Sequence, residues 1–145
     1  MKIRYKKICK TAHEPTYSSP QSAGADLRGC INENIIINPG EIKTIPTGIA
    51  CEIPKDHVGM VCSRSGLAAK NGIAILNSPG IIDSDYRGEI KLIIQNHFNE
   101  KFVIENGMRL AQLVIVPYKH VTWTLTDNLS DTERSTGGLG STGLK

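Results

Sequence analysis

The chain has 145 residues, a mass of 15.8 kDa and a formal net charge of +3. Hydrophobic residues make up 39% of it and charged residues 21%, which is typical of a globular domain and argues against a disordered chain. The length predicts one domain, and the mild charge with only 5% aromatic residues argues against a nucleic-acid-binding protein.

The chain also lacks the sequence features of a membrane, secreted or zinc protein. Its apolar runs are all shorter than the ~18 residues of a membrane span. The basic N-terminal stretch 1–10 has no apolar core of the kind found in signal peptides, so we expect a cytoplasmic protein. No C-x-x-C pair occurs, which disfavours zinc and predicts four reduced thiols, at Cys9, Cys30, Cys51 and Cys62.

Short, β-branched apolar segments run along most of the chain, and turn residues such as Pro39-Gly40 and Asn106-Gly107 separate them. Turn signals every 8–12 residues predict an all-β sandwich or barrel, and the lack of long helical patterns argues against a parallel α/β sheet. The predicted strands are Asn34–Asn38, Ile42–Ile45, Ile49–Ile53, Val58–Cys62, Ile73–Leu76, Ile90–Ile94 and Leu110–Val116.

Only the segment Ser65–Lys70 predicts a helix, one or two turns long. Ser65 is able to cap its start, and Asn71-Gly72 ends it. A serine beside free backbone N–H groups at a helix start suits an anion. A plain N-cap is the alternative interpretation of this serine.

The last residues, 132–145, are rich in glycine and almost free of apolar side chains, so they cannot pack by themselves. We expect a β domain over residues 1–131 and a mobile tail over 132–145. The tail contains a G-x-G-x-x-G match at 138–143, but no βαβ unit accompanies it, which argues against a dinucleotide fold. A strip of backbone N–H groups that closes over phosphates and a disordered terminus are both consistent with this composition.

The densest group of reactive side chains lies within Asn77–Glu89. A buried Ile-Ile run delivers Asp83 to a turn there, which suits a general base held by a rigid element, although a simple surface hairpin could use the same residues. Arg64, Ser65 and Gly66 offer a cation, a hydroxyl and open backbone to phosphate oxygens. The segment 107–113 adds an arginine and a glutamine at the start of a strand.

Five segments, in this order, resemble the motifs of a known family, the trimeric deoxyuridine triphosphate pyrophosphatases or dUTPases. These segments are Ser22–Leu27, Arg64–Ala68, Asn77–Glu89, Gly107–Gln112 and Arg134–Gly143. The third is the closest match, and the resemblance extends from Ser22 to the C-terminus. It implies a distorted jelly roll and a homotrimer with sites at the subunit junctions.

The resemblance implies Mg²⁺-dependent hydrolysis of dUTP to dUMP and pyrophosphate, which lowers dUTP and supplies dUMP. Asp83 corresponds to the carboxylate that activates the attacking water, because water needs a proton acceptor to attack phosphorus. Asp85 and Arg109 would be structural, with Arg109 paired to a carboxylate. Asp26 would contact magnesium through water, and its alternative role is a structural carboxylate.

The resemblance also implies a set of substrate contacts. Tyr86 would pack against the deoxyribose and exclude a 2′-hydroxyl. The hairpin would recognise uracil through Asn77, Ile81 and Ile82, while Lys91 is either part of this pocket or a solvated lysine. Ser65 would donate a hydrogen bond to the leaving oxygen. Eight residues, with Ser65 among them, would bind the phosphates or close the site. These are Arg64, Ser65, Gly66, Gln112, Arg134, Leu139, Gly140 and Ser141.

Two positions depart from the family pattern. Ser63 stands where proline usually precedes the arginine, which we expect to loosen the loop. Leu139 stands where phenylalanine usually stacks on uracil, so the base is covered without a π-face, and we expect weaker lid closure and a raised KM.

Two alternative functions remain at this stage. A dUTP-binding regulatory or interaction protein could keep the fold without turnover, and the two departures support it. A dCTP deaminase shares the fold but uses a glutamate in the strand after the third motif. That strand, Ile90–Ile94, has no carboxylate here.

Overall fold

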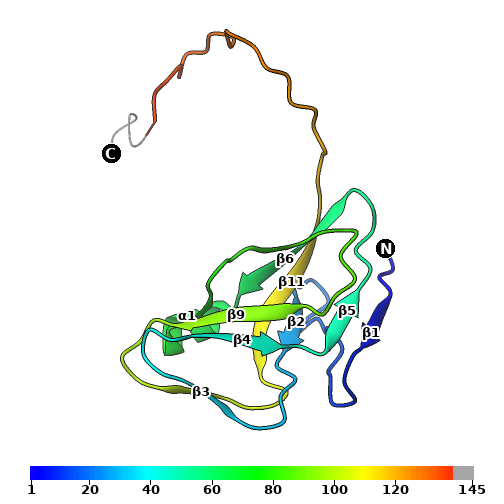
Figure 1. Ribbon diagram of the computed structural model, residues 1–145, viewed down its shortest axis with the longest axis vertical. Helices are drawn as coiled ribbons and strands as arrows, with labels where there is room; N and C mark the ends of the chain where they lie inside the picture. The colour runs from blue at the N-terminus through cyan, green and yellow to red at the C-terminus, as the bar shows by residue number, and fades with distance from the viewer. Residues whose placement is uncertain (139–145) are drawn as a thin grey trace.

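The computed structural model describes residues 1–138, and most of its regular structure is β-strand (Figure 1). β-Branched residues dominate the apolar segments, and their stiff side chains suit a pleated surface. In chain order the elements are β1 (Tyr5–Lys7), β2 (Ala25–Arg28), β3 (Ile35–Ile37), β4 (Ile42–Pro46), β5 (Ile49–Cys51), β6 (His57–Ser63), α1 (Ser65–Asn71), β7 (Ile73–Ile75), β8 (Gly80–Ile82), β9 (Lys91–Asn96), β10 (Phe102–Ile104) and β11 (Arg109–Pro117).

The strands form antiparallel sheets. One sheet has the order β2-β11-β6-β8, another has the order β4-β9-β7, and β1-β5 and β10-β3 are separate pairs. The predicted all-β class is confirmed, and a strand overlaps each predicted apolar segment. Four further strands were not predicted, and each has only three or four residues: β1, β2, β8 and β10.

Isoleucine and leucine side chains fill the core between the sheets. β9 alternates between buried and more exposed positions, and its Leu92 and Ile94 are fully buried. Ile37, Ile45 and Ile104 from other strands meet them in the same cluster. Burying each such side chain contributes about 1.5–3 kcal/mol of hydrophobic stabilisation. The core therefore fixes the strands whose ends carry the candidate site.

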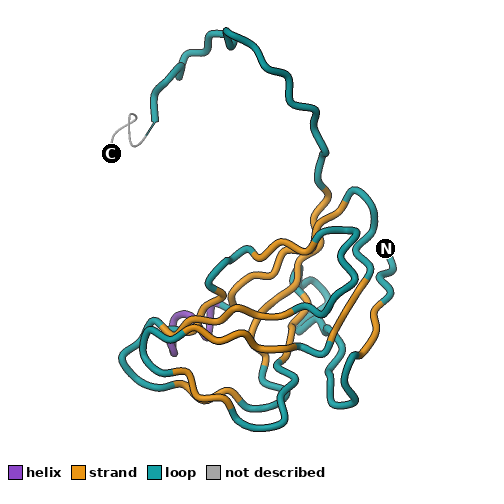
Figure 2. The backbone as a smooth tube through the Cα atoms, in the orientation of Figure 1, coloured by secondary structure: helices purple, strands orange, loops and turns teal. Residues whose placement is uncertain are grey.

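The helix α1 is short and lies at the edge of the strand-rich domain (Figure 2). The predicted cap was wrong, because Arg64 occupies the N-cap position without a side-chain cap and Ser65 is the first helical residue. The predicted end is confirmed at Gly72, which has a φ of 65°. A Cβ at this glycine would also collide with the ring of Phe98, so both conformation and space require glycine.

The predicted reduced state of all four cysteines was wrong for one pair. Cys9 and Cys30 form a disulfide, whereas the buried Cys51 and the partly buried Cys62 are free thiols. The chain after β1 folds back on the turn between β4 and β5, where the Ile8 N–H donates to the Gly48 carbonyl oxygen at 2.7 Å. This long-range contact brings the two sulfurs together, and the spacing of cysteines along the sequence carries no sign of it.

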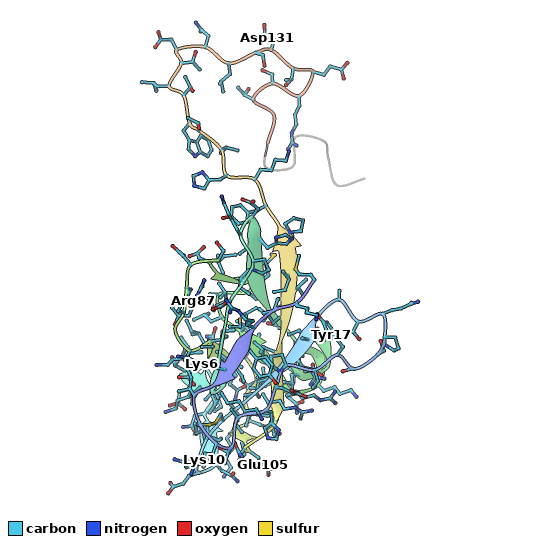
Figure 3. The ribbon with its side chains drawn as sticks, turned by 90° about the vertical axis from the view of Figure 1, so that its right-hand side faces the viewer. Lys6, Lys10, Tyr17, Arg87, Glu105 and Asp131 are labelled. Carbon is cyan, nitrogen blue, oxygen red and sulfur yellow. A yellow bond between two sulfur atoms is a disulfide. The ribbon has the colours of Figure 1, made fainter. Side chains whose placement is uncertain are left out.

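Among the described residues, β11 is the last strand and ends at Pro117, and the segment 118–138 extends away from the domain (Figures 1 and 3). Asp131 lies far out on it in Figure 3. The side chains of Trp123 and Leu125 are 91% and 99% exposed. The boundary predicted at residue 132 stays a prediction. Within residues 1–138, no helix has the length and apolar character needed to cross a bilayer.

Candidate active site

Strand β6 lies at the centre of the candidate site, between β11 and β8 in the sheet. Its C-terminal end leads through Ser63 and Arg64 into α1. Its N-terminal half pairs with β8, with Gly59 opposite Ile82, and β8 leads directly to Asp83. The predicted site residues therefore divide between the two ends of this strand.

Asp26 forms the centre of a charged group at the C-terminal end of β6, which we call the Asp26 cluster (Ser18, Asp26, Arg64 and Arg109). The Asp26 side chain is only 2% exposed. Its Oδ2 accepts hydrogen bonds from Ser18 Oγ at 2.9 Å and from Arg109 Nη1 at 3.1 Å. Arg64 Nε lies 3.1 Å from Asp26 Oδ1, which is close enough for an ion pair but not aligned for a hydrogen bond. Arg109 thus has the carboxylate partner that the sequence analysis expected.

The environment of Asp26 keeps it ionised. Burial by itself raises the pKa of this carboxyl group, but the hydrogen bonds from Ser18 and Arg109 and the charges of Arg64 and Arg109 outweigh burial and lower the pKa below its ordinary value. Two guanidinium groups around one carboxylate leave one positive charge in excess. The cluster is therefore suited to an anion more than to a cation.

The other predicted phosphate-binding residues surround this cluster. Gln112 of β11 lies in register with Asp26 on one side and with Cys62 of β6 on the other. Ser65 and Gly66 follow Arg64 at the exposed start of α1. Arg64 is held in turn by a hydrogen bond from its Nη1 to the carbonyl oxygen of Arg109, at 3.2 Å. The structure thus brings the predicted phosphate-binding residues of β6, α1 and β11 together.

Asp83 lies at the opposite end of β6, in an exposed turn. The Tyr86 N–H donates to the Asp83 carbonyl oxygen at 3.1 Å, and the Tyr86 hydroxyl donates to the Glu89 carbonyl oxygen at 3.0 Å. The Tyr86 side chain is 44% exposed, and a Cβ on Gly88 would collide with its ring. Both Asp83 and Tyr86 are therefore accessible in this turn.

Two hydrogen bonds fasten this turn to the turn between β4 and β5. Glu89 Oε1 accepts from the Gly48 N–H at 2.8 Å. The Thr47 hydroxyl, which is fully buried, donates to the Ile90 carbonyl oxygen at 2.6 Å. Glu89 and Thr47 were not predicted as site residues, because contacts between distant turns have no local sequence signal.

The predicted base-recognition residues lie in β8 and in the segments before and after it, and β8 pairs with β6 where the sequence suggested a hairpin. Asn77 is exposed before β8, and its Nδ2 lies 3.2 Å from the position of a Cβ on Gly80. Ile81 is 56% exposed, Ile82 is partly buried and Lys91 is exposed at the start of β9. The side chains of Asn77, Ile81 and Lys91 are therefore accessible to a ligand.

A single chain does not bring Asp83 to the Asp26 cluster. Asp83 follows Ile82, which pairs with Gly59 of β6. Arg64 follows Gly59 by five residues, and at ~3.3 Å per residue the distance along the strand from Gly59 to Arg64 is about 16 Å. Arg134 lies on the segment that extends from the domain, where its Nε donates to the Gly137 carbonyl oxygen at 2.9 Å. Leu139, Gly140 and Ser141 lie outside the described residues.

Comparison with known proteins decides the family. The dUTPase family model matches residues 10–143, which is most of the chain. This chain belongs to the dUTPase family. It is 51% identical over 130 residues to a deoxyuridine 5′-triphosphate nucleotidohydrolase of Rickettsia bellii, covering 90% of this chain and 87% of that dUTPase. It is 46% identical over 148 residues to the protein of the same name from Orientia tsutsugamushi (strain Boryong), covering all of both dUTPases.

Solved dUTPase structures agree with this assignment. The dUTPase of Staphylococcus bacteriophage 80alpha, as a G164S mutant with dUpNHpp, superposes with a TM-score of 0.90 at 29% identity and covers 99% of both chains. The dUTPase of Staphylococcus aureus phage phi11 superposes with a TM-score of 0.82 at 24% identity, covering 91% of this chain and all of that one. The resemblance found in the five sequence motifs is therefore confirmed.

Proposed function

We propose that this dUTPase hydrolyses dUTP to dUMP and pyrophosphate. The observation that carries the proposal is the arrangement of Arg64 and Arg109 around buried Asp26, beside the open start of α1. Its excess positive charge and exposed hydroxyl and amide groups suit a triphosphate. Membership of the dUTPase family supports the same substrate.

In this reaction Asp83 acts as the general base. It accepts a proton from the attacking water as the water oxygen bonds to the α-phosphorus, and the bond from that phosphorus to the bridging oxygen of the β-phosphate breaks. Arg64, Gly66 and Gln112 hold the phosphates, and Ser65 donates a hydrogen bond to the leaving oxygen as its charge develops. The exposed turn of Asp83 leaves room for the water.

Base and sugar selection belong to the segment 77–86, which contains β8. The side chain of Asn77 and the backbone of Ile81 and Ile82 pair with the uracil edge, and cytosine presents the opposite donor and acceptor pattern. Mispaired buried polar groups are costly, so dCTP is rejected. The Tyr86 ring occupies the space that a 2′-hydroxyl would need, which rejects UTP. Lys91 borders this pocket.

The residues present fit a magnesium ion that is held mainly by the substrate. Within residues 1–138 no three His, Cys, Asp or Glu side chains are grouped to share a metal ion. Asp26 would contact the ion through water, and because its Oδ1 is buried and lies 3.1 Å from Arg64 Nε, this contact requires Arg64 to turn away toward the phosphates. Magnesium usually keeps several waters and binds substrate phosphates, where it neutralises negative charge.

The active form is a homotrimer in which copies share their sites. The separation of about 16 Å along β6 supports this, because Asp83 of one copy needs the Asp26 cluster of another. Val121, Trp123 and Leu125 alternate with threonines and are all more than half exposed, which favours a strand that a second copy covers. In the tail, Arg134, Leu139, Gly140 and Ser141 close over the bound nucleotide. We expect the trimer in the cytoplasm.

Pyrophosphate release from dUTP, UTP, dCTP and dTTP tests the function, with magnesium and then with a chelator. We expect release from dUTP alone, lost with chelator and in Asp83→Asn. Binding of dUTP without release would favour a binding protein, for which Ser63 and Leu139 are the supporting residues. Ammonia release from dCTP would instead favour a deaminase.

A further inference from the structure

Ser63 makes hydrogen bonds to both ends of the turn that carries Asn77. Its Oγ accepts a hydrogen bond from the Ile75 N–H at 2.8 Å. Its own N–H donates to Ser78 Oγ at 3.3 Å. The turn itself is closed by the Ser78 N–H, which donates to the Ile75 carbonyl oxygen at 3.2 Å. Asn77 therefore lies in a turn whose first and last residues both contact one serine.

The bond to Ile75 joins two sheets. β7 is an edge strand that pairs with β9, and the next N–H along the chain, that of Leu76, donates to Ile93 of β9 at 2.8 Å. Since alternate N–H groups of a strand point to opposite sides, the Ile75 N–H points away from β9 toward β6. Ile75 is 4% exposed, so water cannot easily replace the Ser63 hydroxyl as its partner.

From these contacts we infer that Ser63 is a positioning residue for base recognition. It fixes the turn that presents Asn77, and so it sets how well the pocket is formed before the nucleotide binds. The inference rests on the proposed function, in which Asn77 pairs with uracil. Ser63 also directly precedes Arg64, so one residue connects the phosphate-binding end of β6 with the base-recognition turn.

This role changes the interpretation of Ser63 as a departure that loosens its loop. Proline has neither a backbone N–H nor a hydroxyl, so it could make neither of the two hydrogen bonds. Serine at this position therefore stabilises the loop by contacts to β7 and Ser78 that a proline would lose.

Kinetics of Ser63→Ala, Ser63→Thr and Ser63→Pro on dUTP test this inference. Ser63→Ala should raise KM about three- to tenfold with kcat nearly unchanged, since it weakens binding equally in the ground and transition states. Ser63→Thr keeps the hydroxyl and should restore the parent KM. Ser63→Pro should raise KM at least as much as Ser63→Ala. Thr44→Val, at an exposed position of β4, is the matched control.

Amide hydrogen exchange of Ile75 provides a second readout that does not depend on turnover. Exchange should accelerate in Ser63→Ala and Ser63→Pro, and stay slow in Ser63→Thr and Thr44→Val. Ser78→Ala removes only the weaker bond and should give a smaller rise in KM. It also provides a milder variant if Ser63→Pro does not fold.

The outcomes separate the two proposals. If the parent protein releases no pyrophosphate from dUTP, the proposed function fails. If the parent is active and Ser63→Ala exchanges Ile75 quickly but keeps the parent KM, the positioning role alone is wrong. A fall in kcat at constant KM would also overturn it, because that result would assign Ser63 to the chemical step.

Discussion

Asp26 and Arg109 lie 83 residues apart in the sequence, yet the Asp26 carboxylate accepts a hydrogen bond from Arg109 Nη1 at 3.1 Å. The contact crosses from β2 to its neighbour β11. Because Arg64 flanks the same carboxylate, one buried acid sets the position of two cations. In the proposed site, stability and phosphate binding are therefore coupled at Asp26.

Replacing this acid should destabilise the protein. Asp26→Asn leaves Arg64 and Arg109 without their counter-ion, and we expect a loss of about 2–3 kcal/mol in the free energy of unfolding, less than for a fully buried pair because both guanidinium groups keep contact with water. Urea unfolding at pH 7 measures the loss. Asp85→Asn, at an exposed position, is the control and should stay near the parent. Equal stability of all three proteins would contradict the central role of Asp26.

The lowered pKa of Asp26 predicts how stability depends on pH. A carboxyl group with a lower pKa in the folded state contributes stability that is fully present above its unfolded pKa of about 3.9 and is lost as the pH falls through the folded pKa. Parent stability should therefore decline below about pH 4 more steeply than that of Asp26→Asn. Unfolding curves between pH 7 and pH 3 test this, and parallel profiles would show that Asp26 does not contribute.

Glu89 should control sugar selection through Tyr86. Glu89→Ala removes the acceptor of the Gly48 N–H and frees the segment whose carbonyl oxygen holds the Tyr86 hydroxyl. We expect the ratio of kcat/KM for dUTP to that for UTP to fall about tenfold, which corresponds to roughly 1.4 kcal/mol. Glu89→Gln keeps an acceptor oxygen and should retain most of the ratio. If this ratio is the same in Glu89→Ala as in the parent protein, Glu89 does not control sugar selection.

Shared sites predict complementation between two inactive variants. Asp83→Asn and Arg64→Ala should each be inactive alone. Refolding them together in equal amounts should restore about a quarter of the sites. Each site takes Asp83 from one copy and Arg64 from another, and each of these residues is intact in half of the chains. Pyrophosphate release after co-refolding measures the recovery. If the mixture stays inactive although mixed trimers form, each site belongs to one chain.

Leu139→Phe tests the expected weakness of lid closure. A phenylalanine ring in place of the leucine would both cover uracil and stack on it, so KM for dUTP should fall severalfold with little change in kcat. Leu139→Ala should change KM in the opposite direction. A titration in which Leu139→Phe keeps the parent KM would show that closure is not limited at this position.

Local sequence patterns predicted much of the fold. The β-branched runs gave correct positions for strands such as β4 and β9, because alternation and turn residues act over a few positions. β2 was missed because four residues with Asp26 among them form too short a pattern. The Ser65 cap failed because Arg64 took the N-cap position with its backbone alone. The prediction of reduced thiols failed for Cys9 and Cys30, because the N-terminal segment folds onto Gly48 through a long-range contact.

The sequence alone determined the all-β class and the family, because motif order and residue type are properties of the linear chain. The site residues that it indicates stay predictions. Tertiary structure decided how these residues are grouped. Strand order places β11 between β2 and β6, so that the carboxylate of Asp26 on β2 meets Arg109 at the start of β11 and Arg64 just after β6. Strand register separates Asp83 from them along β6. Both depend on pairing between residues far apart in sequence, where each contact is set by the packing of the whole sheet.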